Sequence, residues 1–257
     1  MSRITQRGAT GPLALQAGGA FQTSTDSSLA TLVGTRWDLS DGREVILVSA
    51  SSATTVASGK LYQDAAIIAD HTNIAVTAFQ AYSANGNVPA KVTVTLGATA
   101  VTANQYQGGF VVVNDNNGEG QTLRIASHPA ASGSASLAIT LEDGPNTALT
   151  TASEVCLIPP HGANVIISPT TATNASAGVA LYPIAASAYG FLVSKGLVSC
   201  LADATAPANG APITPSVATA GAIGQPGYAA NVLTTTVIGT SVATSVSTEY
   251  RTVFINV

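Results

Sequence analysis

The sequence predicts an all-β protein, built as an antiparallel sandwich or as barrel-like domains. Residues 91–96 (KVTVTL) alternate, with Val92, Val94 and Leu96 on one face, and this is the two-residue period of a half-buried strand. Short apolar runs recur at even spacing between Gly, Pro, Asn and Ser residues, as in sandwiches and barrels. Alanine is frequent but interleaved with Thr, Val and Gly. These residues disfavour helices, because β-branched side chains lose rotamer freedom there and Gly costs about 1 kcal/mol.

The apolar runs form two series of predicted strands. The first series, which has the pattern of an antiparallel meander from residue 91 onward, comprises residues 44–50, 91–96, 110–114, 122–127 and 136–142. The second series comprises residues 154–159, 164–168, 178–184, 189–196, 197–203, 234–239 and 249–257. Lys195 and Gly196 are predicted to form a turn between two strands of the second series. Residues 58–71 fit neither period well, so a short helix there stays an open alternative.

These patterns predict three parts of the chain. Residues 1–30 are rich in Gly, Ser, Thr and Gln without a sustained period, and we expect an extended N-terminal arm, of which about residues 1–25 are mobile until they meet a partner. Residues 31–150 and 151–257 are predicted to form two β-rich domains, separated after the turn EDGPNTALT. The Pro/Gly-rich segment 204–231 is a long connection of the kind that usually serves an interface. A short strand near Ile213 is the alternative for that segment.

Composition argues against several classes of function. Charged residues make up 9% of the 257 residues, against roughly 25% in an average soluble domain. Lysine and arginine are scattered singly, so the basic patch of a nucleic-acid-binding protein is missing. The chain shows neither the apolar core of a signal peptide nor the roughly 20 apolar residues of a membrane span. We therefore expect synthesis in the cytoplasm, no nucleic-acid or membrane partner, and a final place in a protein assembly.

The residues that most often perform chemistry are few and dispersed. His71, His128 and His161 lie outside ligand spacing of one another and of any cysteine, so we expect surface or turn histidines and no zinc site. Residues 115–120 (DNNGEG) resemble the start of a calcium loop, but the twelfth position is Ala126, where such a loop needs a glutamate. A hairpin turn is the favoured interpretation, and a weak cation site is the alternative.

Catalysis and cofactors are not expected. The sequence contains no GxSxG, GxGxxG, P-loop or HExxH pattern, and no Ser or Thr has a base at a spacing that would indicate a nucleophile. With 13 acidic residues and 3 histidines in the chain, we predict no catalytic, cofactor-binding or metal-binding residue. Cys156 and Cys200 cannot build a disulfide framework, and we expect two buried thiols, with a single bridge as the alternative.

Two stretches of the chain resemble virion structural proteins of tailed bacteriophages. The first is GVALYPIAASAYGFLVSKGLVSCLADATAPANGAPITPSVATAGAIG at 178–224, followed by TEYRTVFINV at 248–257. The second is TVTLGATAVTANQYQGGFVVVNDNNGEGQTLRIASHPA at 93–130. What recurs is a pattern of glycine, aromatic and apolar positions and not a catalytic motif, and residues 1–60 take no part in it.

The resemblance implies a coat, capsid decoration or head-associated protein, present in many copies and without catalysis. Its expected partners are the major capsid protein or other virion proteins, together with further copies of itself. A trimer is favoured, because decoration proteins of this group often occupy local threefold axes. The expected location is the virion, after synthesis in the host cytoplasm. A phage fibre or surface adhesin that binds a host receptor is the alternative, and an enzyme is the third and least favoured hypothesis.

The residues that carry the pattern suit a structural role. Tyr189, Gly190 and Phe191 join aromatic rings to a glycine that permits close backbone approach. We expect them to build the fold, with direct contact to a partner as the alternative. A core is predicted to contain Phe191, Val193, Leu197 and Val198.

Overall fold

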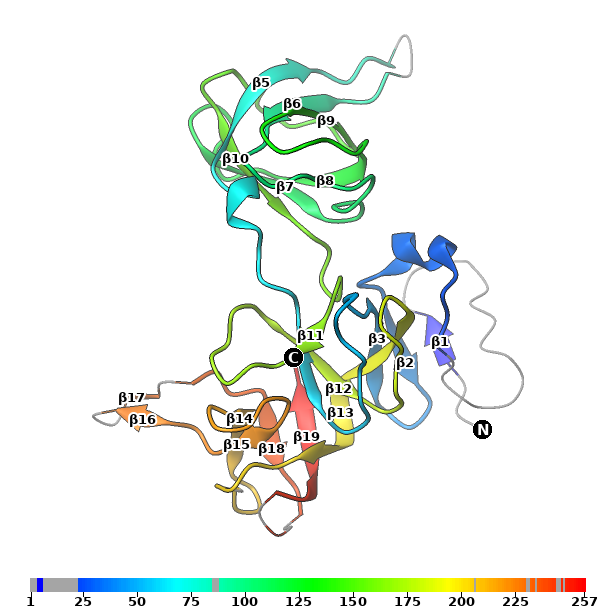
Figure 1. Cartoon of the computed structure of the whole chain (residues 1–257), viewed down its shortest axis with the longest axis vertical. Coiled ribbons are helices and arrows are strands. Elements are labelled where there is room, and N and C mark those ends of the chain that lie inside the picture. The colour runs from blue at the N-terminus through cyan, green and yellow to red at the C-terminus, as the bar shows by residue number, and fades with distance from the viewer. Residues whose placement is uncertain are drawn as a thin grey trace. The chain divides into compact units, whose positions relative to one another are not determined.

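In the computed structural model of the chain, the regular secondary structure is almost entirely β-strand (Figure 1). The structure describes residues 4–6, 23–84, 88–205, 207–229, 232–233, 235–243, 246 and 248–257, of which 4–6, 228–229 and 232–233 are described as backbone alone. In these ranges the helical residues form short 3-10 turns, and the named strands pair antiparallel. The all-β prediction is confirmed, because the alternating, β-branched segments pair into sheets.

The chain folds into two compact units. Unit 1 combines Met1–Ala66 with His161–Val257, and unit 2 is the segment Ile67–Pro160 inserted between them. The strands of unit 2 close on one another in a barrel, so the division follows the sheets.

This division differs from the predicted one. The predicted boundary between residues 31–150 and 151–257 falls inside unit 2, because β10 (Glu154–Ile158) completes its barrel. The turn EDGPNTALT is thus a connection within the barrel and not a linker between domains. Unit 1 is discontinuous, because one of its chain segments lies before the insertion and the other lies after it. Turn and composition signals along the sequence do not reveal such a topology.

Unit 2 is a closed barrel. Its elements are η2 (Ala69–His71), β5 (Ile74–Gln80), β6 (Lys91–Thr95), β7 (Phe110–Asp115), β8 (Thr122–Ser127), β9 (Ser136–Leu141) and β10 (Glu154–Ile158). Around the barrel the strands follow the order β10, β5, β6, β9, β8, β7. The predicted meander is right for β7, β8 and β9, but β6 pairs with β9 and not with β7. The connection from β6 to β7 buries Val101 and Tyr106 in the barrel core.

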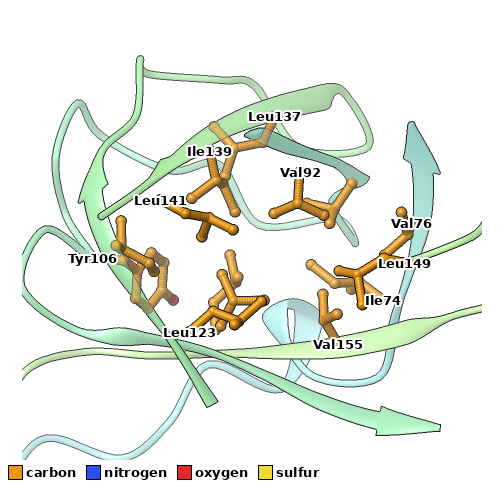
Figure 2. Close-up of a cluster of buried hydrophobic side chains, with 14 of the residues drawn as sticks. Ile74, Val76, Val92, Tyr106, Leu123, Leu137, Ile139, Leu141, Leu149 and Val155 are labelled. Atoms are coloured by element: carbon orange, nitrogen blue, oxygen red, sulfur yellow. The ribbon is translucent and has the colours of Figure 1, made fainter. Parts of the chain in front are cut away.

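The barrel core is filled by inward-facing apolar side chains (Figure 2). Val92 and Val94 of β6 lie opposite Ile139 and Leu137 of β9, and all four are fully buried. The β6 residues between and beside the two valines are partly or fully exposed, which confirms the alternation predicted at 91–96. Each such side chain stabilises the fold by about 1.5–3 kcal/mol relative to leaving it in water.

Unit 1 contains a branched sheet that counts eleven strands over the described residues. The elements of unit 1, inside and outside this sheet, are β1 (Ile4–Gln6), η1 (Ser27–Leu32), β2 (Arg36–Leu39), β3 (Glu44–Ser49), β4 (Leu61–Gln63), β11 (Ile166–Ile167), β12 (Ser176–Ala180), β13 (Tyr189–Leu201), β14 (Pro212–Pro215), β15 (Ile223–Gly224), β16 (Tyr228–Ala229), β17 (Val232–Leu233), β18 (Gly239–Ser241) and β19 (Tyr250–Asn256). The main path is β1–β2–β3–β13–β19–β18–β14–β15. Strand β12 links β13 to β4, which also pairs with β11, and β16 and β17 form a separate hairpin.

Strand β3 of this sheet is buried on both faces. Val45 and Leu47 enter one apolar cluster, whereas Ile46 and Val48 enter another. A strand covered on both sides needs a continuous apolar run instead of an alternating one. This requirement explains the segment EVILVS.

Strand β13 is one continuous strand of 13 residues, so the predicted turn at Lys195 and Gly196 is wrong. Its register against β3 shifts between Val193 and Lys195, and Gly196 adopts a φ of 109°. The resulting bulge bends the strand without reversing it. Its first half pairs with β3 and its second half with β19. Glycine supplies positive φ to bulges as well as to turns, which is why the sequence alone does not separate the two.

The N-terminal segment is in part attached to unit 1. Residues 4–6 pair with β2 as strand β1, and Ser24 exchanges two backbone hydrogen bonds with Tyr189. The following 3-10 helix η1 packs Leu29 and Leu32 against the core. The predicted arm of residues 1–30 is therefore too long, because part of it is attached to unit 1. Residues 1–3 and 7–22 lie outside the described residues. The mobility of the arm stays a prediction.

Two ambiguous segments are resolved by the structure. Residues 58–71 contain the short strand β4 and the 3-10 turn η2, and no α-helix. Segment 204–231 contains β14, β15 and β16, and Ile213 is fully buried within β14. The strand that was the alternative near Ile213 is thus confirmed.

Candidate functional site

The second half of β13 exposes apolar side chains together with β19. Leu197 lies opposite Phe254, and Leu201 lies opposite Tyr250. Leu197 is 49% exposed, Phe254 45% and Tyr250 53%. The prediction that Leu197 fills a core is wrong, because β13 alternates from residue 195 onward and turns Leu197 to the side opposite the buried Val198.

We call this surface the outer face and define it by strand alternation and register. It consists of Lys195, Leu197, Ser199 and Leu201 of β13, Thr240 of β18 with the adjoining Val242, and Tyr250, Thr252, Phe254 and Asn256 of β19. The opposite side of the same strands enters the unit 1 core through Val198, Cys200, Val253 and Ile255. The three strands are neighbours in the sheet (Figure 1). Lys195 is the one Lys, Arg, Asp or Glu among these ten residues.

The aromatic rings of the outer face are supported from within unit 1. A Cβ atom added to Gly59 would collide with the Tyr250 ring, so this ring packs directly on the backbone at Gly59. Phe254 stands between Leu197 and Thr240 in the strand register. The face is thus held in a defined shape by the sheet, and preformed apolar surfaces lose less side-chain entropy when a partner binds.

The Tyr189, Gly190 and Phe191 sequence has contacts that serve the fold. The Phe191 ring meets Trp37 edge-on, with ring centroids 5.4 Å apart and planes at 85°. A Cβ atom on Gly190 would come within 2.6 Å of the Ile184 side chain. The backbone of Tyr189 is held by Ser24. These contacts agree with the expectation that the three residues build the core of unit 1.

Two of the three histidines form a buried polar cluster with Tyr106 in unit 2. The Tyr106 hydroxyl and His71 Nδ1 are hydrogen-bonded at 2.6 Å, while His71 Nε2 donates to the Thr99 carbonyl oxygen at 2.9 Å. The Tyr106 backbone N–H donates to His128 Nε2 at 3.0 Å, and His128 Nδ1 donates to the Pro129 carbonyl oxygen at 2.9 Å. These partners set the tautomer of His128 and place a hydrogen on Nε2 of His71, because a carbonyl can only accept and a backbone N–H can only donate.

The His128 ring is therefore neutral in the observed hydrogen-bond pattern. Burial lowers the pKa of His128, and the neighbouring His71 lowers it further, although the Pro129 carbonyl acts in the opposite direction. Burial also raises the pKa of Tyr106 to about 12. Every polar ring atom has a structural partner, so the cluster ties the β6–β7 connection to the barrel.

The third histidine, His161, is partly exposed and belongs to unit 1. Its Nδ1 lies 2.7 Å from Asp64 Oδ2, and the second carboxylate oxygen of Asp64 accepts from the Gly162 N–H at 2.8 Å. This contact joins the two chain segments that lead into and out of the inserted unit. The rings of His71 and His128 are buried, so neither is a surface histidine, although His71 does lie in the 3-10 turn η2.

The loop at 115–120 has the geometry of a hairpin connection between β7 and β8. The Asp115 side chain accepts from the Asn116 N–H at 2.8 Å, which occupies one of its oxygens. Asn116, Gly118 and Gly120 have φ values of 61°, 86° and 81°, as tight turns require. Across the described part of the chain, no three His, Cys, Asp or Glu side chains converge as a metal site would need. The hairpin interpretation accounts for the loop.

The two cysteines are free thiols. Cys200 is fully buried in the unit 1 core, and burial raises its pKa to about 12. Cys156 is only partly buried, and its sulfur accepts from the Asn73 N–H at 3.3 Å. The expectation of two buried thiols holds for Cys200 and fails for Cys156, because β10 turns that side chain outward from the barrel.

A buried aspartate that the sequence did not single out organises the Pro/Gly-rich segment. Asp203 Oδ2 accepts from the Ser216 hydroxyl at 2.6 Å, and Oδ1 accepts from the N–H and the hydroxyl of Thr205, both at 2.8 Å. Asp203 is 3% exposed. An aspartate directly after a strand and before a Pro/Gly-rich segment was the available signal, since aspartates commonly hold such connections by accepting backbone hydrogen bonds.

Comparison with known proteins adds no relative from which a role could be taken. The chain matches no family model, no curated protein and no solved structure. Among the described residues, no helix has both the length and the apolar character needed to cross a bilayer. The function has to be inferred from the chemistry of this chain.

Proposed function

We propose that this chain is a non-enzymatic structural protein of a phage virion, which decorates or stabilises the capsid through protein–protein contacts. The observation that carries the proposal is the outer face, with exposed Leu197, Phe254 and Tyr250 on rigid strands. Contiguous exposed apolar surfaces on a folded protein usually mark contact sites for other macromolecules. A surface of this kind serves a protein whose work is to bind other proteins.

The charge content supports the same role. The net charge is −4 with 9% charged residues, so copies of the chain repel one another weakly and can pack densely. A decoration or coat protein has to tolerate such packing. The resemblance to tailed-phage virion proteins, which lies in residues 93–130, 178–224 and 248–257, supplies the kind of assembly.

The polar clusters of the described residues fit a structural role better than a catalytic one. The His71, Tyr106 and His128 cluster is buried and satisfied by backbone groups. Asp203 is likewise buried among hydroxyl and N–H donors. A catalytic acid or base needs access to a substrate, and these groups instead hold connections in place.

The proposal is tested on particles produced by the genome that encodes the chain. Quantitative mass spectrometry of purified particles should find the protein in many copies, on a molar scale comparable to the major capsid protein. Only a few copies per particle would favour the fibre or adhesin alternative. Absence from the particles would contradict a virion role altogether. A reconstruction of intact particles would then show which surface the protein occupies.

A further inference from the structure

We propose that the outer face is the contact surface between two copies of this chain, related by a two-fold axis. The inference deepens the proposed structural role by naming a partner, a second copy. It concerns the isolated protein, however, so the contact and the virion role can each fail without the other.

The register of the outer face is symmetric about its centre. Ser199 lies opposite Thr252, and the two large pairs, Leu197–Phe254 and Leu201–Tyr250, stand two residues to either side of it. A two-fold axis that lies between two such faces and runs perpendicular to the strands exchanges these pairs. The Leu197–Phe254 pair of one copy then covers the Leu201–Tyr250 pair of the other. Two packed sheets of this kind lie about 10 Å apart.

Small residues occupy the centre of the face, and large residues flank it. Under the two-fold axis, Ser199 and Thr252 of one copy face the same two residues of the other copy, and the apolar contact is made by the large pairs on either side. Self-association through one surface requires that the patch be complementary to itself, and here the two flanking pairs exchange while the centre meets its own copy.

The charges at the two ends of the face are complementary under the same axis. Lys195 lies at the end where β13 meets Asn256 of β19. Glu249 is exposed at the other end, directly before β19, where one of its carboxylate oxygens accepts from the Val246 N–H at 3.2 Å. The exchange of ends brings Lys195 of each copy toward Glu249 of the other. A pairing with parallel strands would instead bring like charges together, which disfavours it.

The size of the face predicts a weak contact. The seven residues of β19 extend about 23 Å, and three strands span about 14 Å. A stable complex usually buries about 800 Å² on each partner, which is more than so small a face provides. We therefore expect a Kd in the micromolar range, of about 100 µM or tighter, that becomes effective where many copies are held close together.

A two-fold contact makes a dimer, in contrast to the trimer that the phage resemblance favours. Analytical ultracentrifugation of the full chain over a range of concentrations distinguishes the two. A concentration-dependent monomer–dimer equilibrium is expected. A trimer, or a monomer up to the highest concentration, would overturn the proposal.

The contact residues are tested by Phe254→Ser and Leu197→Ser, each of which should weaken dimerisation by at least about tenfold because an apolar anchor is lost. Circular dichroism and the unfolding midpoint show whether the variants remain folded. Phe110→Ser on the barrel, which also removes an exposed phenylalanine, is the matched control and should leave the equilibrium unchanged. A dimer that resists both outer-face variants uses another surface and refutes the assignment.

The orientation is tested by charge reversal. Lys195→Glu and Glu249→Lys should each weaken the dimer by up to about tenfold at low salt, since each replaces two attractive contacts by two repulsive ones. The double variant should recover most of the lost affinity. Lys91→Glu, at an exposed position of the barrel, controls for net charge. Failure of the double variant to recover would overturn the antiparallel arrangement.

Discussion

The barrel of unit 2 and the β13–β19–β18 region of unit 1 use the same alternating pattern with different outcomes. In β6, the outward positions hold Lys91, Thr93 and Thr95, which water solvates well. In β19, the corresponding outward positions include Tyr250 and Phe254. Both strands bury their other side in a core. Alternation therefore identifies the buried side, whereas the residues on the other side show whether it faces water or offers a contact surface.

The two regions also differ in their edges. The barrel closes on itself, and closure leaves no strand edge that could pair with another chain. The main path of the unit 1 sheet ends in β1 and β15 within the described residues, and Ile223 of β15 also bridges Ala202, directly after β13. The inserted unit is thus a closed barrel, while the main path of the unit 1 sheet has a terminal strand, β1, at one end.

The largest effect is expected from a cavity in the barrel. Ile139→Ala removes a fully buried side chain between the β6 and β8 neighbours of β9. It should lower the free energy of unfolding of the barrel by about 2–5 kcal/mol. Hydrogen exchange of the barrel amides under native conditions measures this loss. A loss below about 1 kcal/mol would mean that the core is not packed as described.

An intermediate effect is expected from Asp203 in unit 1. Asp203→Ala leaves the Ser216 and Thr205 donors without their buried acceptor, which should cost about 1–3 kcal/mol. Asp203→Asn keeps one acceptor oxygen and should cost less. Chemical denaturation compares the variants, and hydrogen exchange should show the change in unit 1 with the barrel amides unaffected. Equal stability of all three proteins would contradict the role assigned to Asp203.

A smaller effect on stability, which depends on pH, is expected from His128 in the barrel of unit 2. Because burial holds the folded-state pKa of His128 below its usual value of 6.5, the unfolded chain binds the proton first as the pH falls. The contribution of His128 to the free energy of unfolding is therefore fully present above pH 6.5, and it is lost as the pH falls through the lowered folded-state pKa. Protonation at Nε2 would also oppose the Tyr106 N–H.

Hydrogen exchange of the barrel amides at neutral and at mildly acidic pH tests this expectation. The wild-type barrel should lose protection as the pH falls, after correction for the intrinsic exchange rate. His128→Gln, which cannot titrate, should show a smaller loss over the same interval. An identical pH response in both proteins would show that the histidine is not responsible.

The smallest effect is expected on the outer face. Leu197→Thr replaces a half-exposed side chain with one that also favours strands, so the stability of the monomer should change by no more than about 0.5 kcal/mol. Denaturation is measured at concentrations well below the dimer Kd. A loss as large as that of Ile139→Ala would show that Leu197 belongs to a core after all.

Particular residues show which features of the fold could be predicted from the sequence and which could not. The alternation at 91–96 predicted the buried Val92 and Val94 correctly, since a two-residue period needs no knowledge of the partner strand. The strands at 36–39 and 74–80 were not predicted, because Trp37 and Phe79 stand among polar or small residues that weaken the period. The candidate site was misread at Leu197, which belongs to the same apolar run as the buried Val198.

The sequence by itself determined the β class, the position of most strands and the scarcity of charge, because these depend on local period and composition. Tertiary structure alone decided that β6 pairs with β9, that residues 67–160 form an inserted barrel, and that β13 continues through Gly196. It also placed Leu197, Phe254 and Tyr250 on one exposed face. Pairing and register join residues far apart along the chain, and a local pattern shows that a strand has two sides without showing what lies against each.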